Sequence, residues 1–553
     1  MKKILTYIIL ALFPLSGCIT NDLPYPVMVP TVLSVEVEGA SSVDIDNANR
    51  TITAHLQEYV NPKTVKVKSV KVDLDIAELA SGVVGEHDLT SPYKFNIRTY
   101  DDYEWVMTAQ KHIDRYFTVE GQVGSTVIDE VNCRAIATVG KDADVSKVKV
   151  TSLKLGPEGL SDYSMDMSQM RDFSHGISVE VTAFGLTEVW NLYVERTEVS
   201  VDITKINPWA REAYVTAAGV AGMDNGFRYR ILGSTRWLTV DPSDITSDGG
   251  TFVAHITGLE PETDYEVVAY SGADETSVWE FTTETAVRIP NGSFEYASKV
   301  SGKDYYKFYD PSCGVEDGMY MFWGSGNGEG DEGISGSANM GIVITYIDTE
   351  DKVDGRQSVR AQTSQMAGIL AAGNLFTGQF AGLVGTSGGK VNFGRPWESR
   401  PTALKIYCKY VTGKMDIIKG SPAGVTLTKD DYDRAEIKFA LGDWDYRKYG
   451  GTKDSPVHVN TTDARTFIDY DTDPSTIANG GLIIHHDGYI LNGESKVSAS
   501  TDQWIEYTIP LNYHDLDRHP THIIISCAAS QYGDYFTGYS SSKLWIDAVE
   551  LIY

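Results

Sequence analysis

Apolar and polar residues alternate along most of the chain. Val65 and Val67 stand two positions apart with a lysine between them, and Val179 and Val181 enclose a glutamate in the same way. A period of two places successive side chains on opposite faces of a strand, so this pattern predicts half-buried β-strands. Glycine (51 residues) and tyrosine (32 residues) are frequent, as tight turns and strand faces require. We therefore expect an all-β chain built from several β-sandwiches.

The N-terminal part of the chain contains a repeat. The segment IDNANRTITAHL, which begins at Ile45, aligns without a gap with IDEVNCRAIATV from Ile128, at an offset of 83 residues. Further along, Trp105 matches Trp190. Two copies of roughly 80 residues, each made of short strands, predict two small immunoglobulin-like sandwiches at 31–112 and 113–203. The two tryptophans are interpreted as core residues.

A third module follows over residues 204–286. Its marks are Trp237, the turn GLEPETDY at 258–265 and the closing FTT at 281–283. These features resemble a fibronectin type III domain, in which Leu259 and Tyr265 would pack at a corner of the sandwich. The resemblance implies a spacer, because nothing in this module indicates chemistry.

The chain starts with MKKILTYIILALFPLSGC. Two lysines precede an apolar run that is short for a membrane span, and small residues then lead to Cys18. This order resembles a bacterial lipoprotein signal, so we expect a signal peptide at 1–17, a lipid on Cys18 and a tether at 18–30. An ordinary secretory signal with an incidental cysteine is the alternative. Ile19 stands where an aspartate would retain a lipoprotein at the inner membrane, which favours the outer membrane and leaves its periplasmic or cell-surface side open.

Charge and cysteine content exclude some classes of protein. A formal charge of -29 repels phosphate backbones, so we expect no nucleic-acid partner; the charge suits neutral sugars, cations or plain solubility. Beyond Cys18, the cysteines form no C-x-x-C pair, which argues against a zinc site. Buried free thiols are the simpler interpretation, and one disulfide among the last three remains open. The four residues are Cys133, Cys313, Cys408 and Cys527.

From Ile289 onward, glycines, aromatic residues and long loops become more frequent. Motifs occur in order: FWGSGN at 322–327, LAAGNLFTGQF at 370–380, FGRPWESRPTALKIYCKY at 393–410, DYDRAEIKFALGDW at 431–444, and YGDYFTG with SSSKLWIDAVELIY at the end. They resemble the family named putative carbohydrate metabolism domain. The resemblance implies a jelly-roll β-sandwich over 287–553, related to carbohydrate-binding modules.

The last strand carries one inward-pointing acid in its pattern. Asp547 alternates in register with Trp545 and Val549, and a buried carboxylate is costly without a cation or hydrogen-bond donors. The segment NGSFE at 291–295 and this final aspartate resemble the first and last strands of carbohydrate-binding jelly rolls. In those domains the two strands often lie side by side, and their acids share a structural calcium ion. The resemblance therefore implies Glu295 and Asp547 as calcium ligands. Solvated acids without a metal are the alternative.

Sugar binding uses aromatic faces with polar neighbours. Trp323 and Trp397 lie in loop-like sequence, and they are the predicted stacking residues, with Asn327, Asn374 and Arg395 as polar partners. No motif singles out a catalytic pair of carboxylates. The acidic cluster around Tyr470 (Asp469, Asp471 and Asp473) offers candidates without selecting among them.

Three functions fit this organisation. The first is a lipid-anchored envelope protein that binds glycan through its C-terminal jelly roll, with the other sandwiches as a stalk. The second is an adhesin or structural surface subunit with a protein partner, which predicts an exposed apolar patch or an open strand edge. The third is a glycoside-active enzyme, which predicts two convergent carboxylates in a pocket.

Overall fold

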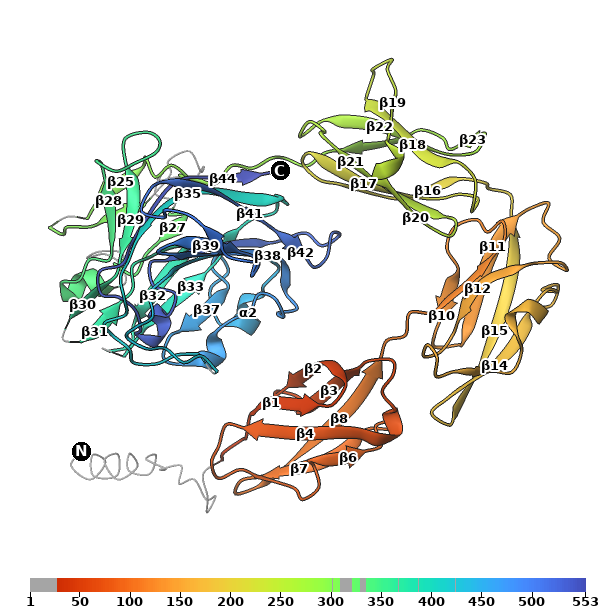
Figure 1. The fold of residues 1–553 in the computed structure, drawn as a ribbon, viewed down its shortest axis with the longest axis horizontal. Coiled ribbons are helices and arrows are strands. Elements are labelled where there is room, and N and C mark those ends of the chain that lie inside the picture. The colour runs from red at the N-terminus through yellow and green to blue at the C-terminus, as the bar shows by residue number, and fades with distance from the viewer. Residues whose placement is uncertain are drawn as a thin grey trace, which may run out of the picture.

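The computed structural model describes residues 27–300, 302–308, 321–328, 335–366, 368–385, 387–422 and 424–553. Four β-sandwich bodies follow one another along a curved path (Figure 1), which confirms the all-β prediction. Cys18 and Cys313 lie outside the described residues. No helix in the described ranges is long and apolar enough to cross a membrane.

The two repeats have the same fold. In each, a hairpin strand pairs in parallel with a long strand, as Thr51 pairs with Val106 and Arg134 pairs with Asn191. Strands of the first are β1 (Val32–Val37), β2 (Ala40–Asp46), β3 (Thr51–Leu56), β4 (Val65–Val72), β5 (Glu78–Leu79), β6 (Gly85–His87), β7 (Tyr93–Arg98) and β8 (Asp102–Lys111), with the 3₁₀ turn η1 (Pro62–Thr64). Strands of the second are β9 (Tyr116–Val119), β10 (Val127–Asp129), β11 (Arg134–Gly140), β12 (Val150–Lys154), β13 (Asp162–Tyr163), β14 (Ile177–Ala183) and β15 (Leu186–Thr197), with η2 (Met167–Gln169).

The same hairpin turn occurs in both copies. Asn49 Nδ2 donates to Asp46 Oδ2 over 2.7 Å, and Asn132 Nδ2 donates to Asp129 Oδ2 over the same distance. The next residue has a positive φ in each copy, 54° at one and 49° at the other. Trp105 and Trp190 are fully buried, as predicted from the repeat.

The third body packs two antiparallel sheets, and Tyr265 and Leu259 lie at one corner of it. The hydroxyl of Tyr265 accepts a 2.9 Å hydrogen bond from the backbone N–H of Glu260, and Leu259 is buried beside it. Its strands are β16 (Asp202–Pro208), β17 (Glu212–Ala218), β18 (Asn225–Ile231), β19 (Leu238–Thr239), β20 (Ile245–Asp248), β21 (Thr251–Thr257), β22 (Asp264–Ser271), β23 (Asp274–Glu275) and β24 (Trp279–Thr282), with η3 (Pro242–Asp244).

The C-terminal body packs a large antiparallel sheet on a smaller one, and the main apolar core lies between them. The large sheet contains β27 (Trp323–Gly324), β32 (Asn374–Leu383), β33 (Gly389–Phe393), β34 (Arg395–Pro396), β36 (Ala435–Gly442), β37 (Val457–Asn460), β38 (Thr476–His485), β39 (Gly488–Leu491), β40 (Val497–Ser498), β42 (Asn512–Tyr513) and β43 (His522–Ala528). The small sheet contains β28 (Thr345–Asp348), β29 (Ser358–Gln362), β35 (Ala403–Val411), β41 (Ile505–Pro510) and β44 (Lys543–Ile552).

Short elements complete this body. Two hairpins are formed by β25 (Ala297–Lys299) with β26 (Tyr306–Phe308) and by β30 (Ser364–Met366) with β31 (Ile369–Ala371). Short helices are α2 (Tyr446–Tyr449), η5 (Ser337–Met340), η6 (Ala464–Thr466) and η7 (Gly533–Tyr535). Cys408 and Cys527 are free thiols buried in the main core.

The terminal strand β44 has different partners from those predicted. It lies between β29 and β35 in the small sheet, so its neighbours are not the 291–295 segment. That segment is a turn, and its Gly292 carbonyl accepts a 2.9 Å hydrogen bond from Val549 N–H of β44. The contact occurs where β44 bulges, because Ala548 has a φ of 46° and interrupts the register with β35.

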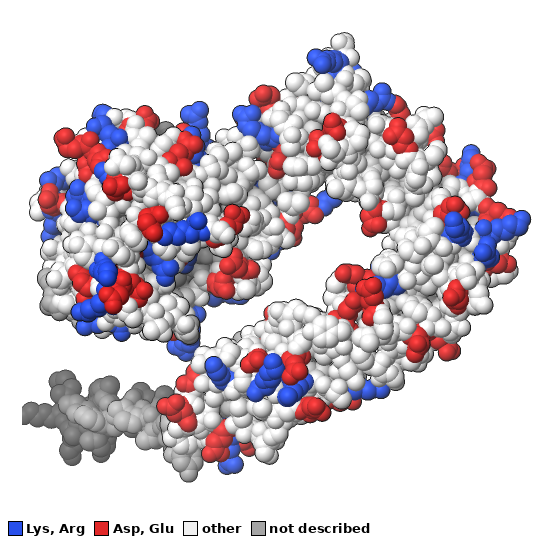
Figure 2. Space-filling view, viewed as in Figure 1, with Lys and Arg blue, Asp and Glu red and all other residues white. Residues whose placement is uncertain are grey.

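Acidic and basic side chains are interspersed over all four bodies on the face shown in Figure 2. An extended single-sign patch of basic residues is not seen on that face.

The third and fourth bodies are joined through a buried arginine. The side chain of Arg400 is 1% exposed and donates to Glu284 Oε1 at 2.6 Å. It also donates to the carbonyl oxygens of Leu516 (2.7 Å) and Pro208 (2.9 Å), and its guanidinium lies 4.7 Å from the ring centroid of Trp209. Glu284, Pro208 and Trp209 belong to the third body, whereas Arg400 and Leu516 belong to the fourth, so this buried guanidinium fixes the two bodies together.

We predict that Arg400→Ala lowers the free energy of unfolding of the chain by about 3–5 kcal/mol, because it leaves the Glu284 carboxylate partly buried and unpaired. Urea unfolding monitored by tryptophan fluorescence measures the loss. Arg447→Ala is the matched control, since its ion pair with Asp445 is exposed and is expected to contribute at most about 1 kcal/mol. Equal effects of the two substitutions would contradict a structural role for Arg400.

Candidate functional site: a polar cleft on the outer face of the large sheet

Strand alternation decides which side chains of β36 and β38 reach the outer face. Ile437 and Leu482 point into the main core, so their neighbours point outward. Lys438 lies opposite Gly481 in this ladder, and Glu436 lies opposite Ile483. The outer face of the sheet therefore carries a lysine and a carboxylate beside a position with no side chain.

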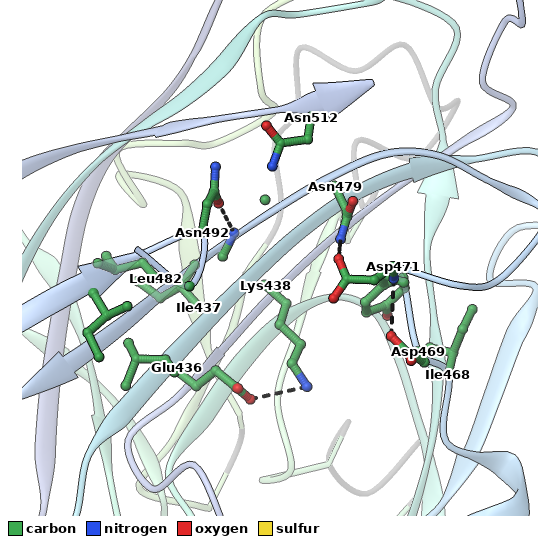
Figure 3. Close-up of a pocket in the computed structure, with 16 residues that line it drawn as sticks. Glu436, Ile437, Lys438, Ile468, Asp469, Asp471, Asn479, Leu482, Asn492 and Asn512 are labelled. Atoms are coloured by element: carbon green, nitrogen blue, oxygen red, sulfur yellow. Dashed lines mark hydrogen bonds and ion pairs between the residues drawn. The ribbon is translucent and has the colours of Figure 1, made fainter. Parts of the chain in front are cut away.

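Gly481 opens a cleft at this point. A Cβ atom placed on it would meet only the Ile437 carbonyl oxygen, at 3.7 Å, which is an ordinary contact. The space above it is a cleft of about 350 Å³, within the size range of small-molecule sites, about 300–1,000 Å³. Figure 3 shows polar side chains surrounding this space from β36, β38, β42 and the loop at 468–471.

One wall of the cleft is the loop that follows η6. The loop is anchored beside a small apolar cluster that contains Trp444, Val457 and Ile524, and the ring of Tyr470 packs edge-on against Trp444 at 6.1 Å. Asp471 Oδ1 accepts a 2.6 Å hydrogen bond from Asn479 Nδ2, which ties the loop to β38. The acidic cluster around Tyr470, which no sequence motif marked as functional, therefore contributes two carboxylates to a wall of the cleft, those of Asp469 and Asp471.

Lys438 is the cation of the cleft. Its ammonium lies 3.2 Å from Glu436 Oε2 and extends toward the acidic loop (Figure 3). Desolvation opposes the charged form, but the carboxylates of Glu436, Asp534 and Asp469 outweigh it and raise the pKa of Lys438. The lysine therefore stays protonated at neutral pH and donates hydrogen bonds.

Several polar groups of the cleft have spare hydrogen-bonding capacity. Among the described residues, the amide of Asn512 and the hydroxyl of Tyr470 make no hydrogen bond, and both residues line the cleft. Asn492, in contrast, is committed to the fold, since it accepts from Gly481 N–H at 2.7 Å and donates to the Pro510 carbonyl at 3.0 Å. Amide, hydroxyl, ammonium and carboxylate groups together match the donors and acceptors of sugar hydroxyls.

The five residues predicted to bind ligand lie elsewhere. Trp323 and Trp397 are only 2% and 6% exposed and pack in the main core, so their faces are not stacking platforms in this structure. Arg395 is buried and donates to the carbonyl oxygens of Phe322 and Gly378. Asn327 is buried, and its side chain bonds the backbone of Ile344 and Thr345. These residues hold the FWGSGN segment in place. Their predicted role in ligand binding is untested, and their burial does not favour it.

Asn374 also supports the FWGSGN segment. Its Oδ1 accepts a 2.7 Å hydrogen bond from Gly326 N–H, and its Nδ2 donates to the Ala372 carbonyl. Unlike the other four predicted residues, it is half-buried on the outer face of the large sheet, where it lines a second pocket.

The two predicted calcium ligands are surrounded by hydrogen-bond donors. Asp547 is fully buried and accepts from the backbone N–H groups of Val353 (2.7 Å) and Asp354 (3.0 Å). Glu295 accepts from the backbone N–H (2.7 Å) and the guanidinium (2.8 Å) of Arg356. Donors already occupy the oxygen atoms that would face a cation. In the part of the chain that the structure describes, no group of three His, Cys, Asp or Glu side chains is placed to hold a metal ion.

This donor set does not fit a calcium ion shared by Glu295 and Asp547. Burial raises the pKa of Asp547, and the three backbone N–H groups of Asp354, Val353 and Ala548 counteract that shift. The acids instead fix the 353–357 segment against the terminal strand.

We predict that removing divalent cations with EDTA leaves the melting temperature of the chain unchanged within about 1 °C, because N–H donors already stabilise both acids. Differential scanning calorimetry of the same sample with EDTA and with added Ca²⁺ measures this. A drop of several degrees in EDTA that Ca²⁺ restores would show a structural calcium site.

A second buried carboxylate, Asp433, lies inside the C-terminal body. Its Oδ2 accepts hydrogen bonds from Ser530, Ser542 and the backbone N–H of Tyr539, over 2.6–2.8 Å. Burial nevertheless raises its pKa from 3.8 to about 6. Because the folded state binds this proton more tightly than the unfolded state, the proton stabilises the fold at low pH, and the stabilisation is lost as pH rises through about 6.

We predict that the native chain loses about 2–3 kcal/mol of unfolding free energy relative to Asp433→Asn when the pH rises from roughly 4 to 7. Other titrating groups are shared by the two chains and cancel in the difference. Urea unfolding at several pH values measures it, and a difference that does not change with pH would contradict the raised pKa.

The sequence carried one signal for the cleft that the motif search did not use. Gly480 and Gly481 stand side by side between Asn479 and the apolar residues 482–484. An internal strand glycine often marks a place where a ligand or another backbone approaches closely. The positions of Lys438 and Asn512 relative to that glycine depend on the pairing of distant strands, so no local pattern could have indicated them.

Comparison with known proteins identifies the class of the C-terminal body. Residues 293–552 match the family described as "Putative carbohydrate metabolism domain". The chain thus consists of three smaller β-sandwich bodies followed by a larger β-sandwich body that matches this family model. No curated protein matches the chain.

The comparison with solved structures found two from Bacteroides species. A "putative glycoside hydrolase" from Bacteroides thetaiotaomicron is 17% identical, with 80% of this chain and 98% of that chain covered and a TM-score of 0.31. A second, from Bacteroides vulgatus, is 19% identical, with 48% and 98% covered and a TM-score of 0.32. The N-terminal four immunoglobulin domains of Dscam1 are 11% identical, with 63% and 95% covered and a TM-score of 0.17. At these TM-scores the similarities carry no argument about activity.

Proposed function

We propose that the chain is a cell-envelope lipoprotein that binds glycan in the outer-face cleft of its C-terminal domain. The observation that carries the proposal is the cleft over Gly481, where the ammonium of Lys438 and two loop carboxylates meet unpaired amide and hydroxyl groups. The match of residues 293–552 to a carbohydrate-related family supports a sugar as the ligand. The signal-like start of the sequence supports a lipid on Cys18, which would place the protein at the outer membrane.

The composition of the cleft favours a neutral or amino-bearing sugar over an acidic one. Three carboxylates, those of Glu436, Asp469 and Asp471, surround a single lysine. Such a field repels anionic ligands, whereas carboxylates accept hydrogen bonds from sugar hydroxyls. The edge of Tyr470 is the aromatic surface that the cleft offers to a sugar ring.

The three preceding sandwiches act as a stalk in this proposal. The fibronectin-like body is more than a spacer, because Arg400 of the C-terminal domain is buried against its Glu284. A fragment that began after residue 284 would leave that guanidinium unpaired. Binding experiments therefore need a chain that retains both bodies.

We predict that residues 27–553 bind a neutral or amino-bearing oligosaccharide on a glycan array, and that Gly481→Val weakens this binding at least tenfold. The valine would fill the cleft above β38, and the strand tolerates a β-branched residue at this open position. Isothermal titration calorimetry with the strongest array ligand measures the change.

Thr508→Val is the matched control, because it places the same side chain on the exposed outer face of the small sheet. It should bind as the native chain does. Equal losses in the two variants, or no array ligand for a folded chain, would contradict glycan binding at the cleft. Release of reducing sugar from the bound glycan would instead show an enzyme.

A further inference from the structure

A second pocket lies on the outer face of the same large sheet. It has a volume of about 150 Å³ and is lined mainly by apolar side chains, among them Ile344, Leu370, Phe380, Leu383 and Val391. Residues of β31, β32 and β33 form part of its wall, and the segment 533–536 lines one side. An apolar cavity of about this size holds a benzene-sized group.

The strand register sets the separation of the two pockets. Asn374 lines the apolar pocket and pairs with Ala528, and Ala528 pairs with Glu436, which lines the polar cleft. These three residues stand in one row across three adjacent strands. Since neighbouring strands lie about 4.8 Å apart, the backbones beneath the two pockets are separated by about 10 Å. A sugar ring with an aromatic ring attached through a glycosidic oxygen is about as long as that distance.

One short segment lines the apolar pocket and lies near the polar cleft. Gly533, Asp534 and Phe536 line the apolar pocket. The next residue after Asp534, Tyr535, packs edge-on against Phe467 at 6.0 Å, beside the 468–471 loop that forms a wall of the polar cleft, and the Asp534 carboxylate helps to raise the pKa of Lys438 there. We call the segment 533–536 the Asp534 ridge. The ridge sits close to β31, because a Cβ atom on Gly533 would lie only 2.3 Å from Cβ of Ala372.

From this arrangement we infer that the ligand is a glycan that carries an apolar substituent about the size of an aromatic ring. The sugar occupies the polar cleft, and the substituent enters the apolar pocket across the Asp534 ridge. The inference rests on the proposed function, and it adds the chemical class of the ligand. Burial of the substituent supplies affinity that hydrogen bonds to hydroxyls alone do not, because those bonds replace bonds to water.

The test compares two glycosides of the terminal sugar of the array ligand, one with a methyl and one with a phenyl group as the aglycone. Titration calorimetry on residues 27–553 measures both dissociation constants. We expect the phenyl glycoside to bind about tenfold more tightly. Ala371→Phe, which fills the apolar pocket from β31, should abolish this preference and leave the methyl glycoside unaffected.

Two further variants keep the outcome decisive. Leu383→Asn makes the same pocket polar without adding bulk, and it should also remove the preference for phenyl if Ala371→Phe does not fold. Gly481→Val should weaken both glycosides equally, because it blocks the polar cleft. Equal affinities of the native chain for the two glycosides would overturn the inference and leave the proposed function standing. Binding of neither glycoside by the folded chain would overturn both.

Discussion

The two sheets of the C-terminal domain pack against each other through a continuous apolar core, and this contact determines where function can lie. Every second residue of β36 and β38 must point inward to fill that core, as Ile437 and Leu482 do. The residues between them are then forced onto the outer face, whatever their chemistry. Lys438, Glu436 and Gly481 form a cleft because their strands pair in a register that keeps the core side apolar.

The family motifs are explained by the same constraint. Four of the five residues predicted to bind ligand are buried and hold backbone segments in place, as Arg395 does for Phe322 and Gly378. Asp433 and Asp547 are buried carboxylates that hold neighbouring backbone segments through hydrogen bonds. Most motif residues therefore report here on how the domain is built, whereas Glu436 and Lys438 of the 431–444 motif line the cleft.

Sequence patterns predicted the architecture better than the site. Period-two alternation and the repeat that matches Asp46 with Asp129 depend on local chemistry, so sandwiches, turns and buried tryptophans could be derived. The partners of the terminal strand and the neighbours of Gly481 depend on contacts between residues far apart in sequence. Tryptophans in glycine-rich sequence indicated a binding loop, although in the fold Trp323 fills the core.

The central claim is that the outer-face cleft over Gly481 holds the sugar. A crystal structure of residues 27–553 with the oligosaccharide that binds most tightly tests it most directly. We predict electron density for a sugar ring above β38, with its hydroxyls within hydrogen-bond distance of Lys438 and of Asp469 or Asn512. Density for the sugar at the FWGSGN segment or at the junction with the third body, and none over Gly481, would contradict the account.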